Sequence, residues 1–174
     1  MSNLIKITSG TLKGHGIKSP NSKLTHPMGS REKLALFNMI AGDLTEAKVL
    51  DAYAGSGALG IEALSRGAKE VVFVEKDAKT CKIIRENLKS LGLDAEVVNT
   101  DVANFISSTI FDIIIADPPY DKFIAGEIRY LVQFLKLDGV LVLSHPNEAP
   151  ELPNLKLIKT HHYAGAHISV YAKR

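Results

Sequence analysis

DAYAGSGALG, residues 51–60, is the most informative stretch of this sequence for its architecture. It directly follows the short apolar run Val49-Leu50 and leads into residues 59–64, whose apolar positions have helical spacing. Gly55 and Gly57 permit positive φ angles and a close approach of the backbone to a ligand, and a helix that begins here offers unpaired N–H groups. The pattern therefore predicts a strand, a ligand-binding turn and a helix.

Short and nearly continuous apolar runs recur along the chain, separated by segments with helical spacing. Runs of this kind are typical of strands that are buried on both faces. Their alternation with helices predicts an α/β fold with a doubly wound, mostly parallel sheet. We expect strands at residues 49–50, 71–74, 95–98, 113–116 and 140–143, and helices at residues 30–41, 59–64, 81–91 and 124–137.

The two ends of the chain show a different pattern. Residues 155–158 and 167–171 are strand-like with only a short connection between them, which predicts an antiparallel hairpin that closes the sheet at its edge. A smaller hairpin is expected within residues 4–17, followed by a linker at residues 19–27 that contains two prolines. At 174 residues we expect one core, with an amino-terminal basic hairpin and linker at residues 1–27 and the main domain at residues 28–174.

The charge of the chain is unevenly distributed. Residues 1–40 carry six cations and one anion, net +5, so the remainder carries +2 − 5 = −3. Such asymmetry predicts a docking site for a polyanion such as RNA at the amino-terminal segment, although a merely solvated basic face is the alternative. The candidate phosphate contacts are Lys6, Lys13, Lys18, Lys23, Arg31 and Lys33.

Composition excludes several other classes of protein. The chain is 45% hydrophobic and 23% charged, an ordinary globular composition, and no apolar run reaches the roughly 20 residues that cross a bilayer. The first residues lack the charged and apolar blocks of a secretory signal, so we expect a cytoplasmic protein without a membrane partner. We also expect it to be a monomer. The single cysteine, Cys81, allows no internal disulfide, and no cluster of metal-ligating residues is present, so no metal is expected.

The turn at residues 51–60 also predicts the cofactor. Gly55 to Gly60 reads as GxGxxG, which suits either a nicotinamide dinucleotide or S-adenosylmethionine, and Glu75 at the end of the next strand can accept hydrogen bonds from a ribose. Asp51 favours S-adenosylmethionine, because a carboxylate repels a pyrophosphate but suits an amine and a sulfonium. Asp101 either accepts a hydrogen bond from the adenine amine, caps the following helix, or does both. The candidate cofactor residues are Asp51, Tyr53, Gly55, Ser56, Gly57, Glu75, Lys76, Asp101 and Val102.

The tetrapeptide Asp117-Pro118-Pro119-Tyr120 directly follows the apolar strand expected at residues 113–116 and predicts the catalytic site. The prolines remove two backbone donors and leave carbonyl acceptors in a stiff, extended segment. An exocyclic base amine needs such acceptors, since Asp117 and the Pro118 carbonyl can each accept one N–H and direct the nitrogen lone pair at a sulfonium methyl. Tyr120 is expected to stack on the extruded base.

In these blocks the chain resembles the RsmD-type 16S rRNA guanine-N2 methyltransferases along nearly its whole length. The resembling blocks are Ile7 to Gly10 with Lys13-Gly14, Ala35 to Asn38, Asp51 to Gly60 with Glu62 to Gly67, Asp117 to Tyr120, and Tyr163 to Gly165. Three parts of the chain differ from the family pattern: His26 stands in place of an arginine, residues 30–34 read SREKL in place of an Asp-Arg-Val-Arg-Glu run, and Ser144 replaces an acidic residue before His145. Roles for His26 and His145 are left open.

The resemblance implies a Rossmann-like class I S-adenosylmethionine-dependent methyltransferase fold with a seven-stranded sheet and an amino-terminal hairpin. It further implies methyl transfer from S-adenosylmethionine, with S-adenosylhomocysteine as product, to N2 of a guanine in 16S rRNA within an assembling small ribosomal subunit. The residues themselves leave open an adenine-N6 or other base-amine methyltransferase acting on RNA or DNA. More distant alternatives are an NAD-dependent oxidoreductase and a non-catalytic RNA-binding module.

Overall fold

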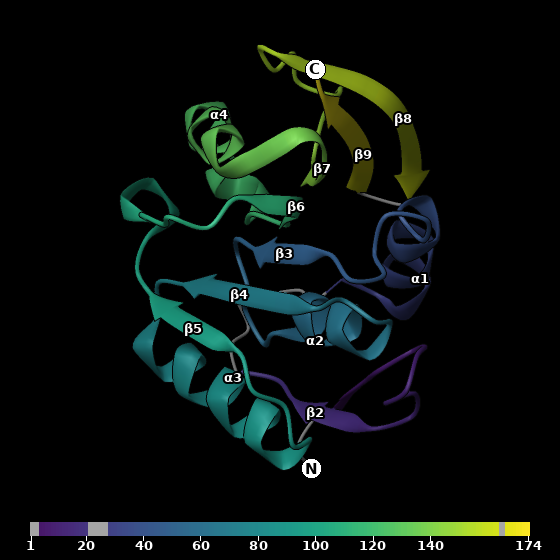
Figure 1. Ribbon diagram of the computed structural model, residues 1–174, viewed down its shortest axis with the longest axis vertical. Coiled ribbons are helices and arrows are strands. Elements are labelled where there is room, and N and C mark those ends of the chain that lie inside the picture. Colours follow the sequence, from purple (N-terminus) through teal and green to yellow (C-terminus); the bar gives the residue numbers. More distant parts are fainter. Residues whose placement is uncertain (1–3, 21–27, 164–165) are drawn as a thin grey trace.

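The structure is a computed structural model that describes residues 4–20, 28–163 and 166–174. A seven-stranded sheet crosses its centre in the order β5-β4-β3-β6-β7-β9-β8 (Figure 1). Its strands are β3 (Lys48–Asp51), β4 (Glu70–Glu75), β5 (Glu96–Asn99), β6 (Phe111–Ala116), β7 (Leu135–His145), β8 (Leu155–Tyr163) and β9 (Ala166–Lys173).

The pairing of the strands confirms the expected topology. Strands β5, β4, β3, β6 and β7 are parallel to one another, whereas β9 pairs antiparallel with β7, and β8 pairs antiparallel with β9. The parallel strands therefore all end at the same end of the sheet. We call this end the carboxyl edge; it holds the ends of β3, β4, β5, β6 and β7. The closing hairpin of β8 and β9 lies beyond β7, on one side of the sheet.

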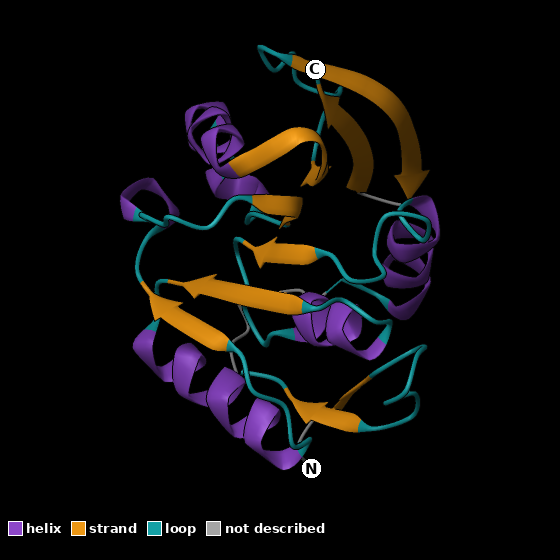
Figure 2. Ribbon diagram, viewed as in Figure 1, coloured by secondary structure: helices purple, strands orange, loops and turns teal. Residues whose placement is uncertain are grey.

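Helices cover both faces of the sheet, as Figure 2 shows. They are α1 (Ser30–Met39), α2 (Ala58–Ser65), α3 (Ala78–Ser90) and α4 (Ala125–Leu131), with short 3-10 turns η1 (Val102–Asn104), η2 (Tyr120–Lys122) and η3 (Val132–Phe134). Neighbouring strand residues point to opposite faces, so Ile113 packs with the core beneath α1, α2 and α3 while Ile114 packs with the core beneath α4 and η1. Burial on both faces explains why the central strands β3, β4 and β6 are largely apolar, whereas the outer strands β5 and β8 are more exposed and more polar.

The amino-terminal hairpin consists of β1 (Leu4–Lys6) and β2 (Gly16–Lys18), paired antiparallel. Ile7 and Ile17 are buried in the same core as α1, α2 and α3. The buried carboxylate of Glu62 on α2 accepts hydrogen bonds from the backbone N–H groups of Thr8 and Ser9, each at 2.9 Å. These contacts fix the hairpin against the helices.

The boundaries of two helices were predicted wrongly. The helix expected at residues 124–137 ends at Leu131, because the chain continues through η3 and β7 already begins at Leu135. A register shift in the pairing of β6 with β7 lets this early part of β7 join the sheet, and Asp138 adopts φ 62° within it. At α1, Gly29 occupies the N-cap position that Ser30 was expected to take.

No helix within the described residues is both long enough and apolar enough to cross a membrane.

Candidate active site at the carboxyl edge

The glycines of the turn after β3 have three different structural roles. Gly55 adopts φ 53°, and a Cβ built on it would meet nothing within 4 Å, so the backbone here borders open space. Gly57 is the left-handed N-cap of α2. A Cβ on Gly60 would lie 2.2 Å from Cε1 of Phe73, so only a glycine lets α2 pack this closely on β4. The turn therefore leaves room for a ligand at Gly55 and secures the helix behind it.

Asp51 ends β3 and is 1% exposed. Its Oδ2 accepts a hydrogen bond from the backbone N–H of Gly60 at 2.8 Å, which ties the strand to the first turn of α2. Burial raises the pKa of Asp51 to about 7, with smaller contributions from the nearby carboxylates of Asp117 and Glu75. The protein environment therefore opposes the ionisation of Asp51, and the expectation that its carboxylate repels a pyrophosphate but suits an amine and a sulfonium stays a prediction.

Glu75 ends β4 and holds two loops together. One carboxylate oxygen accepts a hydrogen bond from the N–H of Gly55 and the other from the N–H of Asp77, both at 2.9 Å. The Glu75 carboxylate thus lies directly beside the glycine turn, about twenty residues away in the chain, as the sequence predicted. Lys76 is next to it and exposed.

Asp101 follows β5 and caps η1 by accepting a hydrogen bond from the N–H of Ala103 at 3.0 Å. The capping role that the sequence suggested is thereby confirmed, and a contact with an adenine amine stays a prediction. Val102 is buried in the core behind it, and Ser56 is buried within the glycine turn.

Tyr53 forms a contact that the sequence did not reveal. Its hydroxyl donates a hydrogen bond to Oε2 of Glu127 at 2.7 Å, which connects the turn after β3 to the first turn of α4. Burial, together with Glu127 and Asp101, raises the pKa of Tyr53, so its hydroxyl stays protonated. Glu127 thereby adds a further carboxylate to the carboxyl edge, and only its position in the first turn of an expected helix hinted at a role.

The Asp117-Pro118-Pro119-Tyr120 tetrapeptide leaves β6 at the same edge. In the register of the sheet, Ala116 lies beside Leu143 of β7, so the next pair along the edge is Asp117 and Ser144. Burial raises the pKa of Asp117 to about 6, against the opposing effect of a hydrogen bond with the Ser144 hydroxyl. The Asp117 carboxylate is close enough to that of Asp51 to raise the pKa of Asp51, which places it at the centre of the carboxyl edge.

Tyr120 begins η2 and has 37% of its surface exposed, so its ring is available to a partner. Its hydroxyl forms a hydrogen bond with the Ser144 Oγ at 2.6 Å. Pro118 is buried and Pro119 is exposed. Ser144 received no role from the sequence, where it was noted only as a departure from the family pattern.

The basic residues divide into three groups. Lys6, Lys13 and Arg31 are exposed, and Lys18 is exposed while paired with Glu86 at 2.9 Å. Lys33 is 2% exposed, and its Nζ lies 3.1 Å from Glu62 Oε2 and donates to the Lys6 carbonyl at 2.8 Å. The expectation that Lys33 contacts phosphate is therefore wrong. Lys23 and His26 lie outside the described residues.

The His145 side chain is buried and hydrogen-bonded at both ring nitrogens. Its ring nitrogens bond to the Asn147 carbonyl at 2.7 Å and to the Ser169 hydroxyl at 2.8 Å, and its ring is 5.5 Å from that of His167. Burial lowers the pKa of His145 below its usual value. These contacts join β7 to β9 next to Ser144. In the described ranges, no group of three or more His, Cys, Asp or Glu residues is arranged to hold a metal ion.

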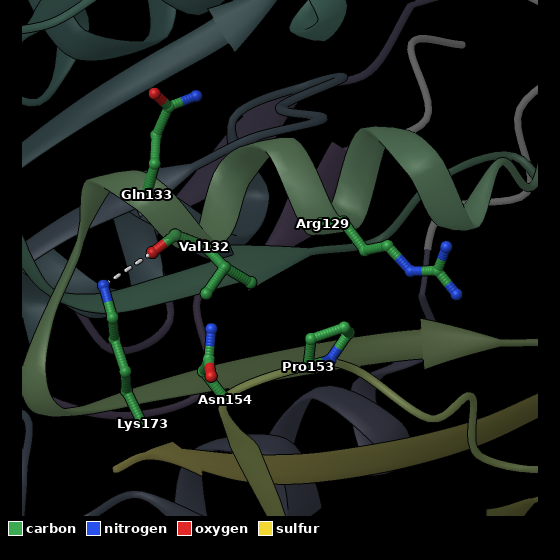
Figure 3. A pocket seen from close by; sticks show the side chains of 6 residues that line it. All are labelled: Arg129, Val132, Gln133, Pro153, Asn154 and Lys173. Carbon is green, nitrogen blue, oxygen red and sulfur yellow. Dashed lines mark hydrogen bonds between the residues drawn. The ribbon is translucent and has the colours of Figure 1, made fainter.

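Two cavities lie away from the carboxyl edge. Figure 3 shows one of about 260 Å³ between α4 and the closing hairpin, where the Lys173 amine donates to the Val132 carbonyl at 2.9 Å. Another, of about 320 Å³, lies at the opposite end of the strands, beside Asp43 and Asp112. Neither of these two cavities is lined by a candidate site residue.

Comparison with known proteins places the chain in a family. The family model described as Conserved hypothetical protein 95 matches residues 5–172. Ribosomal RNA small subunit methyltransferase D of Haemophilus influenzae is 36% identical over 156 residues, 84% of this chain and 81% of that protein. The solved structure of yhhF from Escherichia coli has a TM-score of 0.89 and 28% identity, and each chain is 98% covered.

An rRNA methylase from Streptococcus thermophilus shares the fold, with a TM-score of 0.66 and 13% identity over 86% of this chain and 99% of that one. The expected class I S-adenosylmethionine-dependent methyltransferase fold is thereby confirmed. The chain belongs to the Conserved hypothetical protein 95 family, together with the small subunit methyltransferase D proteins that its sequence resembles.

Proposed function

We propose that the chain transfers a methyl group from S-adenosylmethionine to the exocyclic N2 amine of a guanine in 16S rRNA. The observation that carries this proposal is the arrangement of Asp117 and Tyr120, joined through Ser144, at the same edge as the glycine turn. The name of the Haemophilus influenzae relative, Ribosomal RNA small subunit methyltransferase D, supports small-subunit rRNA as the substrate.

The residues of the carboxyl edge fit S-adenosylmethionine. When bound, it supplies an electrophilic methyl group on a positively charged sulfur. Open space beside Gly55 admits the ligand, and the carboxylates of Glu75, Asp101 and Glu127 give the edge the negative potential that suits a sulfonium and an ammonium group. Glu75 would bind the ribose hydroxyls and Asp101 the adenine amine.

Asp117 and Pro118 would prepare the base amine for reaction. The lone pair of an exocyclic amine is delocalised into the ring, so two acceptors on its N–H groups favour the pyramidal nitrogen that can attack. Because burial raises the pKa of Asp117 to about 6, most Asp117 side chains are ionised at neutral pH and can take up the proton that the nitrogen loses. The exposed ring of Tyr120 would stack on the extruded guanine.

Exposed cations near this edge would guide the RNA. Arg31 lies in the first turn of α1, next to Glu32, whose charge contributes to the raised pKa of Tyr120. The amino-terminal end of α1 is thus close to the proposed base site. Lys6 and Lys13 extend the exposed positive charge onto the hairpin. Phosphate contacts from these side chains would position the RNA without reading its sequence.

The test is incubation with labelled S-adenosylmethionine and small ribosomal subunits that lack the modification, followed by nucleoside analysis. We expect N2-methylguanosine from the natural chain, and loss of most of it from Asp117→Ala, with S-adenosylhomocysteine binding retained in calorimetry. Asp94→Ala, an exposed carboxylate in the loop before β5, is the matched control and should be as active as the natural chain.

Other outcomes of the same experiment would overturn the proposal. N6-methyladenosine as the product would assign the chemistry to an adenine amine, which the same acceptors can serve. Tight NAD binding without S-adenosylhomocysteine binding would favour an oxidoreductase, and RNA binding without any methyl transfer would favour a binding module. Comparing free 16S rRNA with assembling particles tests our further proposal that the particle is the substrate, and sedimentation tests the expected monomer.

A further inference from the structure

Ser144 lies between the two side chains that are proposed to act on the base. It is the penultimate residue of β7 and is 1% exposed. Its Oγ is 2.6 Å from the Tyr120 hydroxyl, and its hydroxyl lies close enough to the Asp117 carboxylate to lower the pKa of that group. The sheet enforces this arrangement, because the parallel pairing of Ala116 with Leu143 brings the next residues of β6 and β7 together.

The number of hydrogens on each group limits how Tyr120, Ser144 and Asp117 can be hydrogen-bonded. An ionised carboxylate only accepts, and a serine hydroxyl has a single hydrogen. A Ser144 hydroxyl that donates its one hydrogen to Asp117 must accept a hydrogen bond from the Tyr120 hydroxyl. The resulting chain of hydrogen bonds begins at an exposed tyrosine and ends at a carboxylate inside the edge.

No nearby cation stabilises the ionised Asp117 among the described residues, so the Ser144 hydroxyl is important for keeping this carboxyl charged. The ionisable side chains whose pKa Asp117 raises are the carboxyl of Asp51 at the end of β3 and the phenol of Tyr120 in η2, and the pKa of Tyr120 is also raised by Glu32 of α1. None of these is a cation, and within the described residues no Lys, Arg or His forms an ion pair with Asp117. Burial opposes ionisation of Asp117, and the hydrogen bond from Ser144 opposes that effect.

We propose that Ser144 is a positioning residue for methyl transfer, which holds the Asp117 carboxylate and the Tyr120 ring in one fixed geometry. The inference rests on the proposed function and adds to it a residue that acts on the base only through two others. Loss of the Ser144 hydroxyl frees the Tyr120 ring to rotate and leaves Asp117 without its donor. This loss should impair binding and deprotonation of the base. It should not impair binding of the cofactor at Gly55 and Glu75.

The test compares Ser144→Ala with Ser144→Thr, which keeps a hydroxyl. In Ser144→Ala, kcat should fall by about ten- to hundredfold, as expected for the loss of a hydrogen bond to a charged group, while KM for S-adenosylmethionine changes by less than about twofold. The acidic limb of the pH profile should move to higher pH, because the donor that favours the charged form is gone. Ser144→Thr should recover most of the rate and the original limb.

Two further variants separate positioning from a general loss of structure. Ser169→Ala removes another fully buried serine hydroxyl, one strand away on β9, and should leave kcat and the pH profile unchanged. Tyr120→Phe keeps the ring but removes its hydroxyl, and it should show a smaller loss of kcat than Ser144→Ala. Should Ser144→Ala retain the natural kcat and pH profile, or lose only affinity for S-adenosylmethionine, the positioning role is wrong.

A measurement that does not depend on catalysis can test the role of Ser144 independently of the proposed function. Carbon-13 NMR titration of the Asp117 carboxyl group in the unliganded protein should show a higher pKa in Ser144→Ala than in the natural chain. An unchanged titration overturns the role of Ser144 whatever the enzyme methylates. Conversely, a raised Asp117 pKa together with no guanine methylation by the natural chain would overturn the proposed function and leave the Ser144 contact established.

Discussion

The Asp51 carboxylate accepts a hydrogen bond from the backbone N–H of Gly60 at 2.8 Å, inside the protein at the end of β3. This bond joins the strand to the helix that follows the glycine turn, so the turn is closed from behind while its other side borders open space at Gly55. Asp51 therefore shapes the proposed cofactor site from the interior.

Asp51 should make the stability of the fold depend on pH. Burial raises its pKa to about 7, above the ordinary 3.8, so between these values the folded chain holds a proton that the unfolded chain has lost. The free energy of unfolding should consequently fall as pH rises through this window, by at most about 1.4 kcal/mol per pH unit from this group, and change no further above pH 7. Urea denaturation at a series of pH values measures it.

The matched variant is Asp51→Asn, which keeps an oxygen acceptor for the Gly60 N–H but does not titrate. Its unfolding free energy should fall less with pH than that of the natural chain over the same window. Equal slopes for the two proteins would show that Asp51 is already ionised in the folded state at low pH.

Asp117 should set the acidic limb of the reaction. Burial raises its pKa to about 6, and only the ionised form can take the proton from the base amine. At saturating S-adenosylmethionine, kcat should therefore rise from pH 5 to pH 7 and then level off. Initial rates across this range test the prediction, and an acidic limb that persists unchanged in the residual activity of Asp117→Asn would assign it to another group.

The Tyr53 hydroxyl should contribute to cofactor affinity. Its hydrogen bond to Glu127 connects the glycine turn to α4, so Tyr53→Phe loosens one wall of the proposed site. We expect KM for S-adenosylmethionine to rise by about two- to tenfold, the range for one neutral or partly charged hydrogen bond, with little change in kcat. Tyr130→Phe is the control, since the Tyr130 hydroxyl also links α4 to another segment but donates to the Phe105 carbonyl and not to the glycine turn.

Replacement of Lys33 should lower the stability of the fold, whereas replacement of Lys13 should weaken RNA binding. Lys33 and Glu62 form a buried pair, and although burial opposes ionisation of Glu62, hydrogen bonds from Thr8 and the nearby Lys33 and Arg66 hold its pKa below the usual value. Lys33→Ala removes one of the two cations beside that buried carboxylate, leaves Arg66 as the other, and should lower the free energy of unfolding by up to about 3 kcal/mol.

Lys13→Ala removes an exposed cation and should leave stability unchanged. If Lys13 contacts a phosphate, RNA affinity falls and the slope of log affinity against log salt decreases by about one. Denaturation and RNA titration of both variants decide the matter, and a stable Lys33→Ala protein with weakened RNA binding would reverse our assignment of Lys33.

Much of the fold was predictable because burial on both faces forces the central strands to be largely apolar. The runs around Val49, Val72 and Ile114 could therefore be read as parallel strands, and the glycine turn marked the first crossover. The limits of α4 were not predictable, since apolar positions from Leu131 to Leu137 suit a helix as well as a strand. The residues from Leu135 onward form a strand because Leu135 pairs with Phe111 of β6. This partner lies more than twenty positions earlier in the chain, so the local sequence does not reveal it.

By itself, the sequence determined which groups are available: a glycine turn after the first central strand, carboxylates at successive strand ends, and Asp-Pro-Pro-Tyr after the fourth. Only the tertiary structure decided their protonation and their partners. Burial moved the pKa of Asp51 to about 7, and the Lys33 amine was turned inward to Glu62. Ser144 was placed against Asp117 and Tyr120 because neighbouring parallel strands end side by side. Desolvation and contacts between distant segments exist only in the folded chain, so residue types alone cannot specify them.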